Sequence, residues 1–268
     1  MKKTFIAVAA AVSAMAFTAV SCSSKKEENT SVAGNTAASE TVSTEGSVEE
    51  VTIDAEAEGN RKYMKGKAEE GVDITVQPFP ECGDIPDDWK EISYESVSMR
   101  IPPDFEEEEN AAHYIKKTYG KKDSFETAYI VEKMKFDNGL IKNYTYPEIT
   151  EEVVANAFKE LGIDYDGTPL STYKAVLSLT SEMRTDQNAE SFEQAMLAKE
   201  IFLSDSSEVF YKQINGHEVY IKKAENGSDG FWCFSAELFV NSKESYSVEV
   251  IGDTLEDALK MCSTISIS

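Results

Sequence analysis

The sequence predicts an α+β fold, in which an antiparallel sheet is flanked by helices as an α/β/α sandwich and preceded by a disordered tether. Two observations lead to the layered domain. Strand-like segments come early and late in residues 87–268, with helical segments between them and one helix near the end. The strands follow one another at hairpin distances, which favours antiparallel pairing. A third observation predicts the tether: the preceding residues are rich in Ser, Thr, Ala and Glu and poor in large apolar side chains.

Residues 1–21 have the parts of a bacterial export signal. Two lysines are followed by an apolar run from Phe5 to Val20 and then by small residues. The run is shorter than the roughly 20 residues that a permanent membrane-spanning helix needs. It also lacks a polar face, which argues against a helix of a soluble core. We therefore expect residues 1–21 to be a signal peptide.

The signal ends in TAVSC, and this motif resembles the lipobox of bacterial lipoproteins, in which the cysteine after the cleavage site receives lipid. The resemblance implies cleavage between Ser21 and Cys22 and acylation of Cys22. The position three before the cysteine is most often Leu in that family and is Ala19 here. Cleavage after Ala14-Met15-Ala16 is the alternative and would leave Cys22 a free thiol. With the lipobox, the protein is expected on the extracytoplasmic side of the bacterial cell envelope, attached to a bilayer through acylated Cys22.

Residues 22–86 are predicted to be the lipidated cysteine and a flexible linker. A coil of this length spans roughly 40–45 Å root-mean-square and would hold a domain away from the membrane. Its last part, residues 61–86, is ambiguous because Val72, Ile74 and Val76 alternate briefly with polar residues. These residues either add an edge strand or drape over the domain at 87–268.

The formal net charge of −23 sets limits on partners. Nucleic-acid binding requires a basic footprint, so no nucleic acid is expected as a partner. The same charge disfavours protein contacts with anionic lipid head groups. It is typical of a solvated surface that repels its neighbours. The expected partners are therefore the bilayer, through Cys22, and an unknown envelope protein or ligand.

Three cysteines remain once Cys22 carries lipid: Cys82, Cys233 and Cys262. An odd number excludes complete pairing within one chain. One disulfide is allowed in an oxidising envelope, and Cys233–Cys262 is the pair to test. The alternative is that both are buried thiols acting as small apolar side chains. No CxxC motif or Cys/His cluster is present, so no metal site and no cofactor is expected.

The predicted domain opens with two short strands and a hairpin. Residues 89–103 contain Val97, Met99 and Ile101 in alternation, and two prolines end the second strand. Residues 111–118 and 125–136 are expected to pair around a turn at 120–123.

Three helices are predicted next. The first covers about 151–161, with Thr150 as its N-cap and Gly162 at its end. The second begins at Pro169 after Thr168. The third begins at Ser191, where SFEQ has the form of a capping box.

The most specific local signal is Asn215-Gly216 between two apolar runs. This pair favours a type I′ hairpin turn, because both positions need positive φ. A two-residue loop pairs Ile214 with His217 and places Tyr211 opposite Tyr220. The next two strands share an apolar face only if the loop near 241–245 has an odd number of residues. A final helix is expected after Asp253-Thr254.

The end of the chain resembles the Mog/PsbP-like α/β/α sandwich domains found in bacterial lipoproteins. Those domains open with a strand pair ending in an apolar-x-apolar-Pro phrase, which is matched by residues 99–102, and close with a helix and a small-residue, Ile-containing phrase, which is matched by 263–266. The resemblance covers roughly residues 89 to 268. It implies the sandwich fold and a binding or scaffold role, since named relatives in photosystems and in nuclear transport bind partners. No binding residue of the family can be matched here.

Candidate catalytic groups are few. His113 and His217 are the only histidines, and neither has a nucleophile motif nearby. The acidic run 106–109 and the Asp/Gly-rich segments 164–167 and 225–230 lack calcium-loop spacing and are expected to be solvated loops and turns. The sequence thus favours a non-catalytic binding or interaction module. The alternative is an envelope hydrolase or ligand-binding enzyme that uses carboxylates in a cleft, which predicts converging acids with perturbed pKa values.

Overall fold

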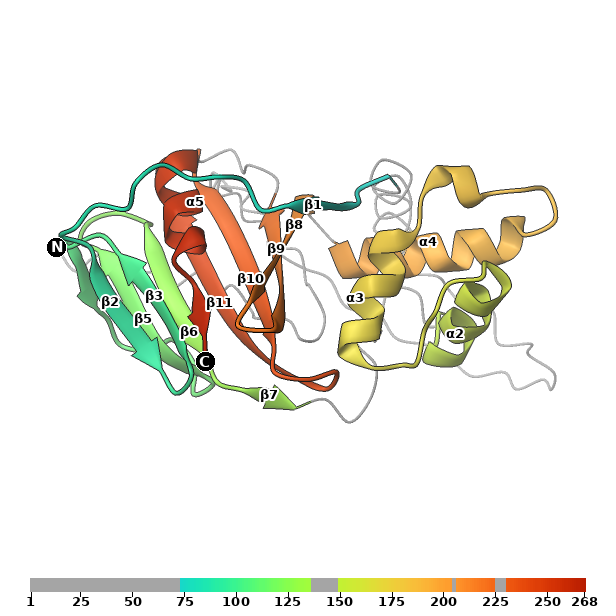
Figure 1. Ribbon diagram of the computed structural model, residues 1–268, viewed down its shortest axis with the longest axis horizontal. Coiled ribbons are helices and arrows are strands. Elements are labelled where there is room, and N and C mark those ends of the chain that lie inside the picture. Colours follow the sequence, from blue (N-terminus) through green and yellow to red (C-terminus); the bar gives the residue numbers. More distant parts are fainter. Residues whose placement is uncertain (1–72, 136–148, 204–205, 225–229) are drawn as a thin grey trace, which may run out of the picture.

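The computed structural model describes residues 73–135, 149–203, 206–224 and 230–268 (Figure 1). The signal peptide, Cys22 and the linker as far as residue 72 lie outside the described residues. The described elements, in chain order, are β1 (Val76–Pro78), β2 (Lys90–Tyr94), β3 (Val97–Ile101), β4 (Phe105–Glu107), β5 (Ile115–Lys121), β6 (Thr127–Val131), β7 (Met134–Lys135), α2 (Glu151–Glu160), α3 (Pro169–Ser178), a 3₁₀ turn (Ser181–Met183), α4 (Ala189–Leu203), β8 (Ser206–Ile214), β9 (His217–Ala224), β10 (Trp232–Phe239), β11 (Glu244–Gly252), α5 (Leu255–Ser263) and β12 (Ser266–Ile267).

Nine of these strands form one large sheet, in the order β1-β8-β9-β10-β11-β6-β5-β4 with β7 also paired to β11. All of its strand pairs are antiparallel except β1 with β8, which is parallel. The remaining three strands form a small antiparallel sheet in the order β12-β3-β2. The fold is therefore α+β with a large, mainly antiparallel sheet, as the sequence predicts.

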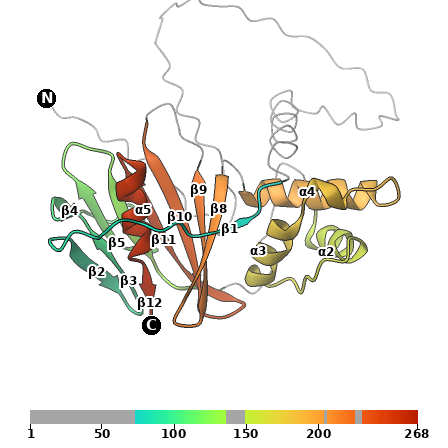
Figure 2. The same ribbon diagram turned by 45° about the horizontal axis from the view of Figure 1, so that its top comes forward.

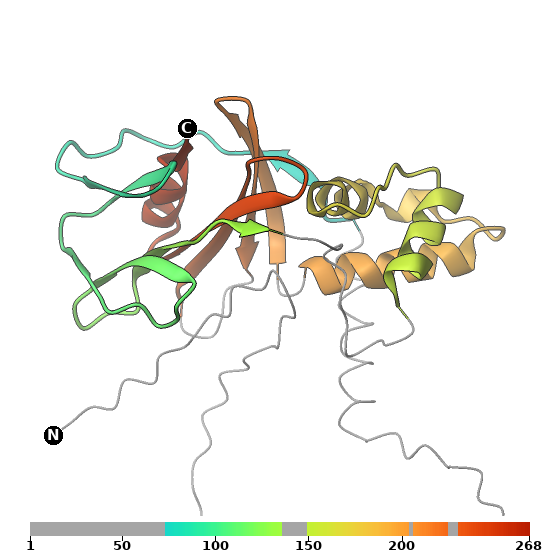
Figure 3. The same cartoon turned by 90° about the horizontal axis from the view of Figure 1, so that it is seen from below.

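Helices lie on both faces of the large sheet. On one face, α5 and the small sheet pack on apolar side chains such as Phe234, Ala236 and Leu238 of β10. On the other face, α2, α3 and α4 form a core whose sheet residues come from β8, β9 and β10. In Figures 1 and 3 these three helices lie together at one end of the sheet. On this same face, β11 and β6 therefore lie at the margin of the helical core.

Local capping signals place most of the helices. Thr150 accepts a hydrogen bond from the backbone of Val153 at the start of α2, and Gly162 follows that helix with φ of 71°. Thr168 and Thr254 cap α3 and α5 in the same way. These predictions are confirmed. Among the described residues no helix is long and apolar enough to cross a membrane.

The predicted start of the third helix at Ser191 is wrong. Helix α4 begins at Ala189, and its first turn closes with a hydrogen bond from Phe192 N to Asn188 O. The Ser191 hydroxyl donates instead to Glu160 of α2. The capping-box pattern fails because a tertiary partner takes the serine, while Asn188 organises the turn before the helix by accepting from Thr185 N.

The hairpin predictions are confirmed. Asn215 and Gly216 have φ of 51° and 86°, and Tyr211 lies opposite Tyr220 with ring centroids 5.3 Å apart. Between β10 and β11, Val240 N donates to Glu244 O at 2.8 Å, so that the enclosed loop, 241–243, has an odd number of residues. The apolar faces of the two strands consequently coincide. The early strand pair also forms as expected. The second hairpin forms between β5 and β6, but Gly120 and Lys121, which were expected in its turn, belong to β5.

Residues 73–86, here called the strap, cross the molecule from the helical core towards the small sheet (Figure 2). Asp73 accepts hydrogen bonds from the backbone and hydroxyl of Ser181, and β1 adds to the edge of β8. Phe79 packs edge-on against Phe210, with ring centroids 5.8 Å apart. Further on, the thiol of Cys82 donates to Leu259 O of α5. The segment thus both adds an edge strand and drapes over the domain.

Candidate functional site

A row of polar side chains crosses the large sheet on the face that also carries α2–α4. Lys222 of β9 lies opposite Ser235 of β10, which lies opposite Glu249 of β11, which lies opposite Tyr129 of β6. Direct cross-strand partners project to the same face of a sheet. The row therefore brings four strands' polar groups together. We call its charged members and their hydroxyl partners the acid–lysine cluster, which comprises Lys222, Ser235, Glu237, Ser245, Ser247 and Glu249.

Serine hydroxyls hold the two carboxylates of the cluster. Ser247 Oγ donates to Glu237 Oε2 at 2.7 Å, and Ser245 donates to the other oxygen of the same carboxylate. Ser235 Oγ donates to Glu249 Oε1 at 2.6 Å. Both oxygens of Glu237 are thus engaged.

Burial dominates the electrostatics of these carboxyl groups, although each side chain keeps some exposed surface. It raises the pKa of Glu249 to about 7, against the opposing effects of Ser235 and Lys222. It also raises the pKa of Glu237, despite the two serine donors. Charged carboxylates lose hydration in such surroundings, so the protonated form gains relative stability.

Lys222 is the member of the cluster that contacts the helical core. Its side chain is buried, and burial lowers its pKa while Glu237 and Glu249 oppose that effect. The ammonium lies 5.1 Å from the ring centroid of Phe202 in α4 and 5.9 Å from that of Tyr173 in α3. Aromatic faces attract cations at such distances. Lys222 therefore joins the carboxylates to the aromatic core of the helical layer.

This arrangement suits reversible proton uptake and polar binding. A carboxyl group that titrates near neutral pH can accept a proton, a hydroxyl donor or an ammonium group under physiological conditions. The histidines take other roles: His217 Nδ1 lies 3.0 Å from Phe239 O, and the His113 ring contacts that of Tyr114. Among the described residues, no group of three or more His, Cys, Asp or Glu side chains is arranged to hold a metal ion.

Cys233 and Cys262, the pair singled out from the sequence, are free thiols, as is Cys82. Cys262 lies in the core between α5 and the large sheet, together with Phe234. Cys233 directly precedes Phe234 in β10, so its side chain projects to the opposite face. The sheet itself therefore separates the two sulfur atoms. Buried thiols, the alternative interpretation, describe Cys262 well because burial raises its pKa far above the ordinary value.

The other acidic segments have ordinary surroundings. In the run 106–109, Glu107 pairs with Lys117 at 2.9 Å on the exposed side of β4 and β5. In the segment 164–167, Asp166 accepts hydrogen bonds from the backbone and hydroxyl of Thr168, which forms a tight turn before α3. Most of the segment 225–230 lies outside the described residues.

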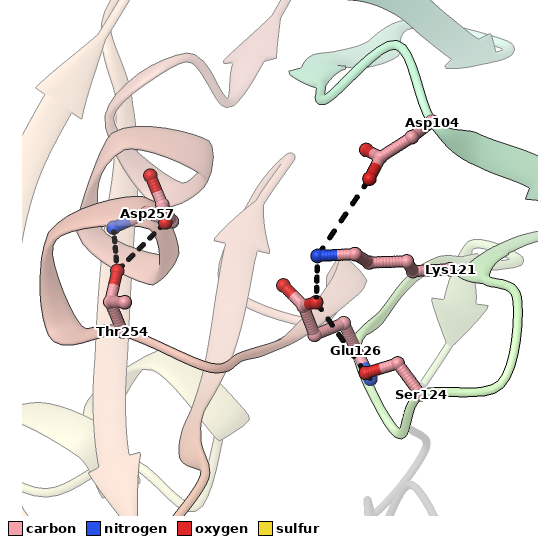
Figure 4. A network of polar contacts seen from close by, with 6 residues as sticks. All are labelled: Asp104, Lys121, Ser124, Glu126, Thr254 and Asp257. Atoms are coloured by element: carbon pink, nitrogen blue, oxygen red, sulfur yellow. Dashed lines mark hydrogen bonds and ion pairs between the residues drawn. The ribbon is translucent and has the colours of Figure 1, made fainter.

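A second polar network holds the turn between β5 and β6 (Figure 4). Lys121 pairs with Glu126 at 2.7 Å and with Asp104 at 3.7 Å, and Ser124 also donates to Glu126. Figure 4 also shows the cap of α5, where Thr254 and Asp257 bond each other. These contacts close a turn and begin a helix, so we assign them a structural role.

Sequence reasoning missed the acid–lysine cluster. In β10, Ser235 and Glu237 alternate with apolar residues, which is the ordinary pattern of a strand with one solvated face. The chain contains 49 acidic residues, so two of them on a pair of strands do not stand out. The signal appears only when neighbouring strands are considered together. Once β9, β10 and β11 are aligned by their turns, Lys222 and two glutamates fall on one face.

Comparison with protein-family models finds no match. No curated protein matches the chain. Among solved structures, the chain is similar to cyanobacterial PsbP (CyanoP) from Synechocystis sp. PCC 6803, with 8% sequence identity and a TM-score of 0.34, covering 72% of this chain and 100% of that one. It is also similar to a protein from Bacteroides thetaiotaomicron VPI-5482, with 11% identity and a TM-score of 0.29, covering 65% of this chain.

The chain spans 45% of the length of the Bacteroides protein, which is a little under half. The solved structures similar to this chain thus include a PsbP protein. At such TM-scores neither likeness assigns a family or a function. The fold class rests on the strand pairing and the helix packing described above.

Proposed function

We propose that this protein is a membrane-anchored lipoprotein of the bacterial cell envelope and acts as a non-catalytic binding module, with the acid–lysine cluster as its ligand site. The observation that carries the binding role is the state of the two carboxylates. Glu237 accepts hydrogen bonds from Ser245 and Ser247, and Glu249 accepts one from Ser235, so that serines hold both carboxylates in place. Carboxylates that are fixed in this way on a sheet are suited to binding, because little ordering is needed.

The anchor proposal rests on the TAVSC motif and on the polar linker behind it. Intact mass of protein purified from its native membrane tests it. We expect a detergent-soluble species heavier than the chain from Cys22 by the mass of its acyl chains. The Cys22→Ala variant should lose this mass, whereas the control Cys82→Ala should keep it. An unmodified soluble chain would contradict the anchor.

The binding role is tested by ligand screening on the full chain, read out by thermal stability. A ligand of the cluster raises the melting temperature, because it binds only the folded state. The shift should disappear in Glu249→Gln. It should persist in Glu244→Gln, a variant of the same strand whose carboxylate contacts Asn241 at the surface. Ligands that act equally on both variants would place the binding site elsewhere.

An envelope hydrolase is the second candidate, and the raised pKa of Glu249 favours it specifically. A general acid that titrates near pH 7 is typical of glycoside hydrolysis, in which it protonates the leaving oxygen while a second carboxylate takes a proton from the attacking water. Glu237 would have to be that base. Both of its carboxylate oxygens already accept hydrogen bonds from serines, which leaves them less able to take up an attacking water and favours binding over hydrolysis.

A turnover assay distinguishes the binding module from the hydrolase. A hydrolase should cleave chromogenic glycosides with a bell-shaped pH profile and lose at least about a thousandfold in kcat in Glu249→Gln. A binding module should show no Glu249-dependent turnover under conditions where its ligand is bound.

A further inference from the structure

Two of the free cysteines lie beside the same turn of α5. The strap passes over this helix (Figure 2), and the Cys82 thiol donates to Leu259 O at 3.5 Å. Cys262 follows Leu259 by three residues in the same helix. A helical side chain begins close to the carbonyl groups three and four residues before it, which is why Ser and Thr can hydrogen-bond there. The side chains of Cys82 and Cys262 therefore flank one carbonyl oxygen.

Lys212 of β8 lies near both thiols. Its ammonium donates to Cys262 O at 2.8 Å. Burial raises the pKa of the Cys82 thiol, and Lys212 is among the groups that oppose this rise. Burial also raises the pKa of Cys262 far above its ordinary value; Lys212 opposes the rise and Cys82 adds to it. Charges act most strongly on near neighbours, so the electrostatics agree with the hydrogen bonds in bringing the two cysteines together.

Cys233, the third free cysteine of the described residues, is separated from this pair. Cys262 packs on the face of the large sheet that carries Phe234, and Cys233 projects to the opposite face. Cys82 contacts α5 and thus lies on the same side as Cys262. A disulfide requires Cβ atoms about 3.5–4.5 Å apart. The thickness of the sheet prevents such an approach to Cys233 from either of the other two cysteines.

The strap can bring Cys82 closer to Cys262 without breaking a strand pair. Strand β1 ends at Pro78, and residues 79–86 have no regular secondary structure. The Cys82 thiol donates only to two carbonyl groups, those of Pro80 and Leu259. A thiol is a weak hydrogen-bond donor. Little is therefore lost when Cys82 moves from Leu259 O towards the neighbouring side chain.

We propose that Cys82 and Cys262 are a thiol pair that a disulfide oxidant converts into an intrachain disulfide, which fastens the strap to α5. The bond closes a loop that contains most of the domain, from the strap to the last helix. Closing a long loop restricts the unfolded chain and so stabilises the folded state. This inference goes beyond the proposed function and is independent of the acid–lysine cluster.

The two thiols have different roles in the exchange. Cys82 is partly exposed and Cys262 is buried, so the oxidant reaches Cys82 first. The Cys82 thiolate attacks one sulfur of the oxidant, forms a mixed disulfide and releases one thiolate. Cys262 then loses its proton and attacks the sulfur of Cys82, which releases the second thiolate. Overall, two protein thiols give up two electrons and two protons, and one disulfide of the oxidant becomes two thiols.

Oxidation of the full chain by glutathione disulfide tests the pair. The chain carries Cys22→Ala, so that only Cys82, Cys233 and Cys262 can react. After alkylation of the remaining thiols, we expect intact mass and peptide mapping to show a Cys82–Cys262 disulfide, no bound glutathione and one alkylated thiol, at Cys233. The oxidised chain should melt roughly 5–10 °C above the reduced chain.

Variants of the other cysteines provide the controls. Cys233→Ser should form the same disulfide and show the same rise in melting temperature. Cys82→Ser should lose both, and circular dichroism of the reduced chain should show that its fold is kept, because Cys82 is only partly buried.

Each other outcome overturns the proposal or a defined part of it. A mixed disulfide that persists on Cys82 would show that Cys262 cannot reach it, and a bond to Cys233 would contradict the separation by the sheet. Absence of any reaction, or formation of the disulfide in urea alone, would mean that the folded structure does not form the pair. A disulfide without a rise in melting temperature would refute the fastening of the strap.

Discussion

Glu249 and Glu256 are a few residues apart, yet their pKa values move in opposite directions. Burial raises the pKa of Glu249 to about 7. A hydrogen bond from Lys260 lowers the pKa of the exposed Glu256. The residue type is the same, so the surroundings alone decide its acidity. At the scale of residues, function in this protein follows from which of its many acids the fold buries.

Replacing Glu249 with Gln should change the pH dependence of stability. The folded-state pKa of Glu249 lies above the unfolded value of about 4.3, so the folded state binds the proton more tightly and wild type loses stability as pH rises from about 4 through 7. A Gln side chain can still accept a hydrogen bond from Ser235, but it does not ionise. We expect the variant to be more stable than wild type by roughly 3–4 kcal/mol at pH 8 and equal to it near pH 4.

Urea unfolding at several pH values measures this difference. Glu244→Gln, on the same strand, serves as the control and should follow the wild-type curve. A constant difference between Glu249→Gln and wild type across the pH range would show that ionisation of Glu249 has no part in stability.

At the scale of elements, α5 depends on a side chain from the sheet it covers. The last carbonyl groups of a helix lack partners within the helix. Lys212 of β8 donates to Cys262 O at 2.8 Å and Ser263 O at 3.2 Å, and its ammonium lies 5.0 Å from the ring centroid of Phe79. Burial lowers the pKa of Lys212 to about 8. One lysine thus joins the helix, the sheet and the strap.

Lys212→Met should destabilise the protein by about 2–3 kcal/mol at pH 7, because buried carbonyl groups lose a charged donor while the packing volume is nearly kept. Chemical denaturation followed by circular dichroism measures this loss. The control is Lys174→Met, which removes a mainly exposed ion pair with Glu218 and should cost well under about 1 kcal/mol. Equal effects of the two substitutions would refute the capping role.

At the scale of the whole molecule, the strap connects layers that are distant in sequence. Its Asp73 accepts a hydrogen bond from the 3₁₀ turn, its strand β1 extends the large sheet, and its Cys82 contacts α5. The strap therefore contacts the helical layer first, then the edge of the large sheet, and then α5. Because an uncovered sheet edge is open to pairing with other chains, β1 also protects β8.

Chains that begin at residue 73 and at residue 80 should differ in stability. The first keeps the strap contacts of Asp73, β1 and Phe79, and should unfold like the full chain. The second loses the ladder with β8 and the Phe79–Phe210 contact, and should be less stable by about 2–4 kcal/mol and more prone to self-association. Urea unfolding and light scattering measure both effects. Identical behaviour of the two chains would remove any structural role for β1.

The sequence by itself determined the local architecture. Thr150, Thr168 and Thr254 cap the helices that they were expected to cap, and Asn215-Gly216 forms the tight turn. The odd loop after β10 followed from matching two apolar faces. These features depend on neighbours within a few residues or across one hairpin. Short-range geometry and burial of apolar faces are therefore sufficient to predict them.

Tertiary structure decided what the side chains of distant segments do together. It paired β1 parallel with β8, moved the start of α4 by giving Ser191 a partner on α2, and placed Cys233 and Cys262 on opposite faces of the sheet. It also covered one polar strand face, so that Glu237 and Glu249 became a cluster with Lys222. Alternation along a strand specifies which residues share a face, but only the packing of layers decides which face loses its water, and loss of water is what shifts a carboxyl group's pKa.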